Sequence, residues 1–220
     1  MLVSHRRRFI YLKTRKTAGT SVEVLLEREC VPEGEYQGPR HESPGLQTSA
    51  GIIGCRLMGS KAPLNPHMTA SEVRALVGDE TWSNYLKFCI VRNPFDKLVS
   101  MWWYKMNDVT RTKLEKAGFS KIRSEFNAWL RGRKDLSDRN IYTVDGLVAV
   151  DRFLRFENLW SDITDLAAGL EFAVDREDLG QYKSGYRARP ESFADYYDPA
   201  SREIVNNLYA WEIGRFGYAI

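Results

Sequence analysis

Two strand-to-helix turns carry residues that could bind phosphate-like anions. In the first, the apolar run Phe9–Leu12 is followed by KTRKTAGTS, from Lys13 to Ser21, which supplies cations, hydroxyls and backbone N–H donors. A helix that begins near Gly19 has unpaired N–H groups in its first turn and the positive end of its dipole there. The lysine precedes the glycine, so this is not the G-x-x-x-x-G-K-[ST] loop of NTPases. The sequence therefore predicts an anion site of another kind.

The second turn follows the apolar run KFCIV, from Lys87 to Val91. It reads RNPFDKLVS, where Asn93 can cap a helix and proline suits the first helical position. Arg92 lies at the strand tip and Ser100 two helical turns later, so both could contact one further phosphate. Two anion sites favour a ligand with two separated phosphates.

The elements around these turns alternate between strand and helix. Strands are expected at 9–12, 87–91 and 152–156, and helices after Gly19, from about Ala70, after 94, after 159 and after 198. Such alternation predicts an α/β fold with a parallel β-sheet flanked by helices, and ligands outside the carboxyl ends of the strands. Both turns should then lie at the same edge of the sheet.

The size of the chain and its content of apolar residues limit the number of domains that it can form. With 220 residues, 43% of them hydrophobic, the chain can bury a full core, and we expect a single domain over 1–220. A stretch rich in Gly, Pro and Ser predicts a long loop at about 32–66, interrupted at most by short elements such as GIIGCRLMG. A helical insertion is expected at about 105–147.

Charge and cysteine content exclude several classes of protein. The net charge of +3 is too small to indicate nucleic-acid binding but suits a small anionic ligand. Three cysteines without metal-ligand spacing argue against a disulfide framework or a metal site. The first strand leaves no room for a signal peptide and no apolar run could span a bilayer, so a cytoplasmic location is expected. The oligomeric state is not predicted.

Four segments together resemble one enzyme superfamily. The sequences KTAGTS, VRNPFDKLVS, RFENL and YYDPASREIVNNLYAWEIGRFGY, in that order, are similar to sulfotransferases that use 3'-phosphoadenosine 5'-phosphosulfate (PAPS), especially the carbohydrate-type branch. The resemblance covers most of the chain and is weakest at 32–66 and 105–150. It implies a P-loop-like sulfotransferase fold, PAPS as sulfuryl donor, and an acceptor hydroxyl on a glycan, glycoconjugate or small molecule.

The resemblance also implies roles for particular residues. The first motif of the family binds the 5'-phosphosulfate and the second the 3'-phosphate, and YKSGYR is similar to a basic loop that closes over the nucleotide. Arg15 stands where many relatives have proline and adds a cation beside the site. The nucleotide-binding residues implied are Arg15, Lys16, Thr17, Ala18, Gly19, Thr20 and Ser21 in the first motif, Arg92 and Ser100 in the second, and Lys183, Ser184 and Arg187 in the basic loop.

Two residues are expected to act directly in an in-line transfer. Lys16 would neutralise the negative charge that grows on the leaving 5'-phosphate. His67 would remove the acceptor proton, because some carbohydrate sulfotransferases place a catalytic histidine between the two motifs and imidazole has a suitable pKa. Glu42 is the competing base. A sulfuryl group carries less charge than a phosphoryl group, so no metal is implied.

Two other classes of protein remain open. A kinase-like P-loop protein would need the Walker spacing, which the first turn lacks. A non-catalytic nucleotide-binding protein is excluded less well. The acceptor also stays open between a glycan, a lipid-linked sugar and a small natural product.

Overall fold

The computed structural model describes residues 1–40, 42–57, 63–182, 185–187 and 189–220. The chain divides into two compact units. We call the first, Met1–Val91 with Asp138–Tyr182, the sheet unit, and the second, Arg92–Ser137 with Lys183–Ile220, the helical unit.

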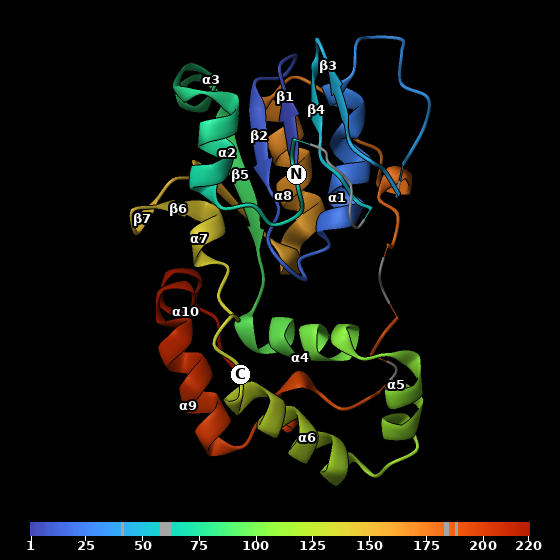
Figure 1. Cartoon of the computed structure of the whole chain (residues 1–220), viewed down its shortest axis with the longest axis vertical. Coiled ribbons are helices and arrows are strands. Elements are labelled where there is room, and N and C mark those ends of the chain that lie inside the picture. The colour runs from blue at the N-terminus through green and yellow to red at the C-terminus, as the bar shows by residue number, and fades with distance from the viewer. Residues whose placement is uncertain (41, 58–62, 183–184, 188) are drawn as a thin grey trace. The chain divides into compact units, whose positions relative to one another are not determined.

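The sheet unit is built on a six-stranded mixed sheet with the order β3-β4-β1-β2-β5-β8 (Figure 1). Strands β2, β5 and β8 run parallel, whereas β1 pairs antiparallel with β2 and β4, and β3 pairs antiparallel with β4. The α/β class and the parallel core are therefore confirmed, but the antiparallel half was not predicted. The strands are β1 Leu2–Ser4, β2 Phe9–Leu12, β3 Leu46–Thr48, β4 Gly51–Ile53, β5 Leu86–Val91 and β8 Arg152–Arg155.

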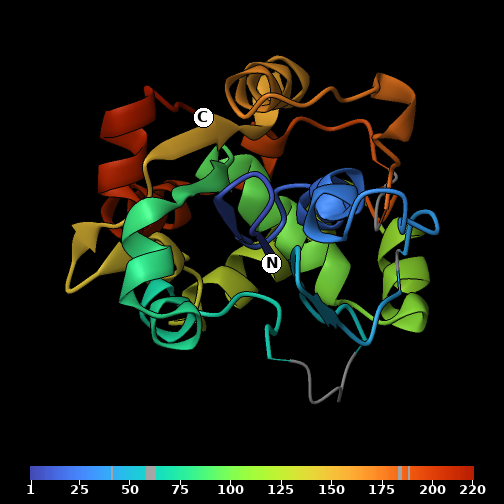
Figure 2. The same ribbon diagram turned by 90° about the horizontal axis from the view of Figure 1, so that it is seen from above.

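Two helices cover one face of this sheet. Figure 2 looks along the strands and shows α1, Gly19–Leu26, and α8, Leu159–Gly169, nearly end-on, so both run roughly along the strands. Side chains that alternate along the strands point to this face, as period-two spacing requires. Its core contains Phe9 and Tyr11 of β2, Phe88 and Ile90 of β5, Val22 and Leu25 of α1, and Ile163 and Leu166 of α8.

The helix after His67 begins where the sequence predicted. In α2, Ala70–Val77, the Thr69 hydroxyl accepts from the Glu72 backbone N–H at 3.2 Å, and the Glu72 carboxylate accepts from the Thr69 N–H at 2.7 Å. This capping box fixes the helix start. The sheet unit also contains α3 Asp79–Asn84, α7 Arg139–Tyr142 and the hairpin of β6 Thr143–Val144 with β7 Leu147–Val148.

The helical unit has a core of its own. As predicted, the Asn93 side chain caps α4, Pro94–Lys105, by accepting from the Phe95 N–H at 3.0 Å. Aromatic side chains dominate the core, including Trp102, Phe126 and Tyr196. The other helices are α5 Asp108–Glu115, α6 Phe119–Arg131, α9 Pro199–Leu208 and α10 Ala210–Phe216.

Three irregular or helical segments differ in detail from expectation. Strand β3 was not expected inside the loop at 32–66, whereas β4 lies in GIIGCRLMG, where a short element was expected. The expected insertion at 105–147 contains α5, α6 and α7 but ends in the β6–β7 hairpin. The C-terminal helix is interrupted at Tyr209, which separates α9 from α10. In the described part of the chain, no helix is both long enough and apolar enough to cross a bilayer.

Candidate anion-binding site

The first turn is attached to the carboxyl end of the neighbouring strand. Leu12 of β2 lies opposite Cys89 of β5 in the parallel register. Just beyond β2, the Thr14 hydroxyl donates to the carbonyl of Ile90. The two strands therefore end at the same edge of the sheet, as the alternation of elements predicted.

The backbone of this turn has a conformation that is common in anion sites. Lys16 and Ala18 both have left-handed backbones, each with φ of 58°. Ala18 is the N-cap residue of α1 and makes no side-chain capping hydrogen bond to the helix. The first N–H groups of α1 have no intrahelical acceptors, and alternation of left-handed residues turns successive N–H groups into a concave anion site. The turn thus fits a phosphate or sulfate group.

Three hydroxyls that the sequence assigned to the ligand also hold the turn in shape. The Thr17 hydroxyl lies 2.9 Å from the Thr14 hydroxyl, and the Thr20 hydroxyl accepts from the Lys13 ammonium at 3.2 Å. The Ser21 hydroxyl accepts from the backbone N–H of Tyr182 at 3.3 Å. This last bond connects the turn to the chain just before the expected basic loop. Lys183 and Ser184 of that loop lie outside the described residues.

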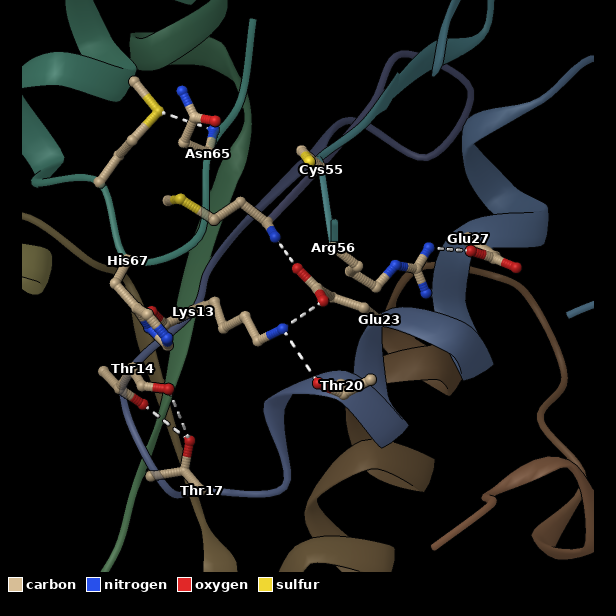
Figure 3. Close-up of polar contacts among 12 residues, drawn as sticks. Lys13, Thr14, Thr17, Thr20, Glu23, Glu27, Cys55, Arg56, Asn65 and His67 are labelled. Atoms are coloured by element: carbon tan, nitrogen blue, oxygen red, sulfur yellow. Dashed lines mark hydrogen bonds and ion pairs between the residues drawn. The ribbon is translucent and has the colours of Figure 1, made fainter. Parts of the chain in front are cut away.

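A buried ion pair connects the turn with α1. Figure 3 shows the Lys13 side chain crossing to α1, where its ammonium donates to the Glu23 carboxylate at 2.5 Å. Both side chains are buried. Gly19 makes room for this side chain, because a Cβ on Gly19 would lie 2.8 Å from Lys13 Cγ. Sequence analysis missed Glu23, although an acid between Val22 and Val24 of an apolar helix needs a buried partner.

Arg15 binds a carboxylate of the same unit. Its guanidinium Nε donates to Asp138, and its backbone N–H donates to the other oxygen of that carboxylate at 2.9 Å. Asp138 is buried beside the start of α7. The extra cation noted in the sequence is therefore paired with Asp138, a partner that the sequence did not reveal.

His67 lies beside the first turn and within the sheet unit. Its Nδ1 atom is 2.9 Å from the carbonyl oxygen of Lys13. A carbonyl can only accept, so Nδ1 carries the proton, and Nε2 of the neutral ring has the lone pair that can accept another. Burial lowers the pKa of His67 to about 4, although the bond to Lys13 opposes this change. Glu42, the competing base, is exposed.

The second motif belongs to the helical unit, where one carboxylate binds two arginines. Arg92 donates from Nε and Nη2 to one oxygen of Asp96, at 2.9 and 2.6 Å. Arg187 donates from Nη1 to the other oxygen at 2.9 Å. Ser100 is partly exposed on α4. The structure thus joins Arg92 with Arg187, and Asp96 is the residue that sequence analysis missed.

A comparison with protein families found one match. The model described as "Sulfotransferase family" matches residues 1–162 of the 220. This range contains the first turn, His67 and the second motif, but not Arg187. The comparisons with curated proteins and with solved structures gave no match.

Proposed function

The chain belongs to the sulfotransferase family, in the carbohydrate-type branch that uses PAPS, and on this premise we propose that its acceptor is a carbohydrate or glycoconjugate hydroxyl. Family membership implies sulfuryl transfer from PAPS to a hydroxyl group. Membership of the carbohydrate-type branch supports a carbohydrate as the acceptor. We also propose that residues 1–220 act as one sulfotransferase domain in the cytoplasm.

The main observation in favour of a PAPS site is the start of α1, which has no side-chain cap and lies close to Lys16 in the sequence. Lys16 and the N–H groups of Gly19, Thr20 and Ser21 bind the 5'-phosphosulfate in this proposal, because they supply one cation and several converging donors. Arg92, Arg187 and Ser100 bind the 3'-phosphate. Arg15 acts through its pairing with Asp138, which holds the turn.

Lys16 and the helix N–H groups stabilise the charge that develops during transfer. As the acceptor oxygen forms a bond to sulfur, the bond from sulfur to the 5'-phosphate oxygen breaks, and that oxygen gains negative charge. A fixed cation and fixed N–H dipoles lower the energy of this state more than that of the bound donor. Because the sulfuryl group carries less charge than a phosphoryl group, we propose that the reaction needs no metal.

His67 takes the proton of the acceptor hydroxyl on Nε2. The Lys13 carbonyl supports this role because it holds the proton on Nδ1 and so leaves Nε2 as the basic atom. Glu42 remains the rival base. A kinase-like P-loop protein and a non-catalytic nucleotide-binding protein remain the alternative functions, and the family match favours neither.

The proposal is tested by transfer of labelled sulfate from PAPS across a panel of acceptors. The panel contains glycans, lipid-linked sugars and small natural products, and reactions contain EDTA. We expect labelled product with at least one carbohydrate acceptor, formed on the order of a hundredfold more slowly, or slower still, by the Lys16→Ala variant. Labelling of small non-carbohydrate molecules alone would contradict the proposed acceptor class, and a requirement for Mg²⁺ would contradict the mechanism.

A further inference from the structure

In the helical unit, one carboxylate lies between two arginines. Asp96 accepts two hydrogen bonds from Arg92 on one oxygen and one from Arg187 on the other. The Asp96 side chain is only 18% exposed, and those of Arg92 and Arg187 are 12% and 28% exposed. Charge-assisted bonds at these lengths fix geometry strongly. Asp96 therefore contacts both guanidinium groups, one through each carboxylate oxygen.

Helix capping accounts for only part of this arrangement. Asp96 lies in the first turn of α4, where an acid interacts favourably with the helix dipole, and it pairs with Arg92 four residues away. Neither effect requires Arg187, which lies 91 residues from Asp96 in the sequence. The second oxygen of the carboxylate is instead used to bring a distant cation next to Arg92.

We propose that Asp96 is a positioning residue that holds Arg92 and Arg187 as a two-arginine clamp for the 3'-phosphate of the nucleotide. This inference rests on the proposed function, because it takes that phosphate as the ligand of Arg92. A long arginine side chain loses much rotamer freedom when it binds an anion. Asp96 restricts both side chains beforehand, which lowers the cost of binding a phosphate.

The same carboxylate also has an opposing effect. Its negative charge repels a phosphate and lowers the positive potential of the arginines. If this repulsion outweighed the ordering of the side chains, removing the charge would tighten binding. We expect the restriction of the two arginine side chains to outweigh this repulsion. Removing the charge of Asp96 should therefore weaken phosphate binding, and the direction of the change in affinity is itself a test.

The experiment measures affinities for adenosine 3',5'-bisphosphate and for adenosine 5'-phosphate, which lacks the 3'-phosphate, by calorimetry. Asp96→Asn, which keeps the shape of the side chain, should weaken bisphosphate binding roughly tenfold, an effect of the size found within salt-bridge networks. Binding of the monophosphate should change less than about twofold. Arg187→Ala should weaken bisphosphate binding in the wild-type background but much less in the Asp96→Asn background.

Glu191→Gln is the matched control. Glu191 pairs with Arg189 at 2.5 Å, two residues from Arg187, so this variant also breaks an ion pair in the same segment. It should leave the ratio of bisphosphate to monophosphate affinity unchanged. A purely structural role for Asp96 would lower the stability of the fold without changing that ratio.

Three results would overturn the inference: an unchanged ratio in Asp96→Asn, tighter bisphosphate binding, or additive effects of the Asp96 and Arg187 substitutions. Each presupposes that the wild-type protein binds the bisphosphate. If the wild-type protein bound neither nucleotide, the proposed function itself would fail. The two failures are therefore distinct.

Discussion

The Nδ1 atom of His67 lies 2.9 Å from the carbonyl oxygen of Lys13, the first residue of the candidate anion-binding turn. Because the carbonyl accepts the Nδ1 proton, the bond selects the tautomer with a basic Nε2. At the other end of Lys13, the ammonium binds Glu23 of α1. One residue thus connects the candidate base with the helix whose N-terminus forms the candidate anion site.

The first prediction concerns the identity of the base. His67→Ala should lower turnover roughly a hundred- to ten-thousandfold, as loss of a general base does, and leave the affinity for adenosine 3',5'-bisphosphate nearly unchanged. Glu42→Gln is the paired variant and should retain most activity. Steady-state kinetics of both variants with one acceptor decide the matter, and the reverse pattern would assign the base to Glu42.

The second prediction concerns the pH dependence of activity. Desolvation of the half-buried ring disfavours its charged form and lowers the pKa of His67 to about 4 in the free protein. The acidic limb of kcat/KM for PAPS, which reports the free enzyme, should therefore lie near pH 4 and be absent in His67→Ala. A bound anion favours the protonated ring, so the limb of kcat should lie at higher pH. A kcat/KM limb near the ordinary histidine pKa of 6.5 would contradict this environment.

The third prediction concerns the stability of the fold in acid. Between pH 6.5 and 4 the unfolded chain binds more protons at His67 than the folded one, so this residue makes stability fall as the pH falls. Between pH 7 and 4, wild type should lose about 3 kcal/mol more unfolding free energy than His67→Gln, which cannot titrate. Urea denaturation at several pH values measures this, and parallel losses in both proteins would refute the prediction.

The fourth prediction concerns the lysine of the first motif. Lys16→Ala should lower turnover on the order of a hundredfold or more, because the lost cation meets charge that develops in the transition state. Bisphosphate affinity should fall much less. Lys121→Ala, which removes an exposed lysine of α6, serves as the control. A Lys16→Ala enzyme with normal turnover would remove the basis for the assignment.

The fifth prediction concerns Gly19. An alanine there would place its Cβ 2.8 Å from Lys13 Cγ and 3.2 Å from the Tyr11 hydroxyl oxygen. The ion pair with Glu23 limits how far Lys13 can move, so Gly19→Ala should cost about 1–3 kcal/mol of unfolding free energy. Gly169→Ala in α8, where a Cβ would meet nothing within 4 Å, should cost far less in the same denaturation experiment.

Much of the fold could be predicted because its signals are local. The apolar run of β5, the Thr69–Glu72 capping box and the Asn93 cap are each contained within a few residues. Strands β1, β3 and β4 have three residues each, which is too short to establish a period-two pattern. Their antiparallel pairing therefore emerged only from the tertiary structure.

The same distinction applies to the site. The two motifs were recognisable because each is a continuous segment with its own residue spacing. The carboxylates that pair with the arginines of these motifs could not be recognised in the same way. Asp138 lies 123 residues from Arg15, and Arg187 lies 91 residues from Asp96. No spacing rule connects such residues, since the fold alone brings them together.

The central claim is that this chain binds the PAPS nucleotide through its two motifs. Calorimetric titration with adenosine 3',5'-bisphosphate in EDTA tests it most directly, with Mg-ATP as the competing ligand. We expect binding of the bisphosphate without Mg²⁺, and weaker binding in Arg92→Ala because a ground-state phosphate contact is lost. Binding of Mg-ATP alone, or undiminished affinity in a folded Arg92→Ala variant, would contradict it.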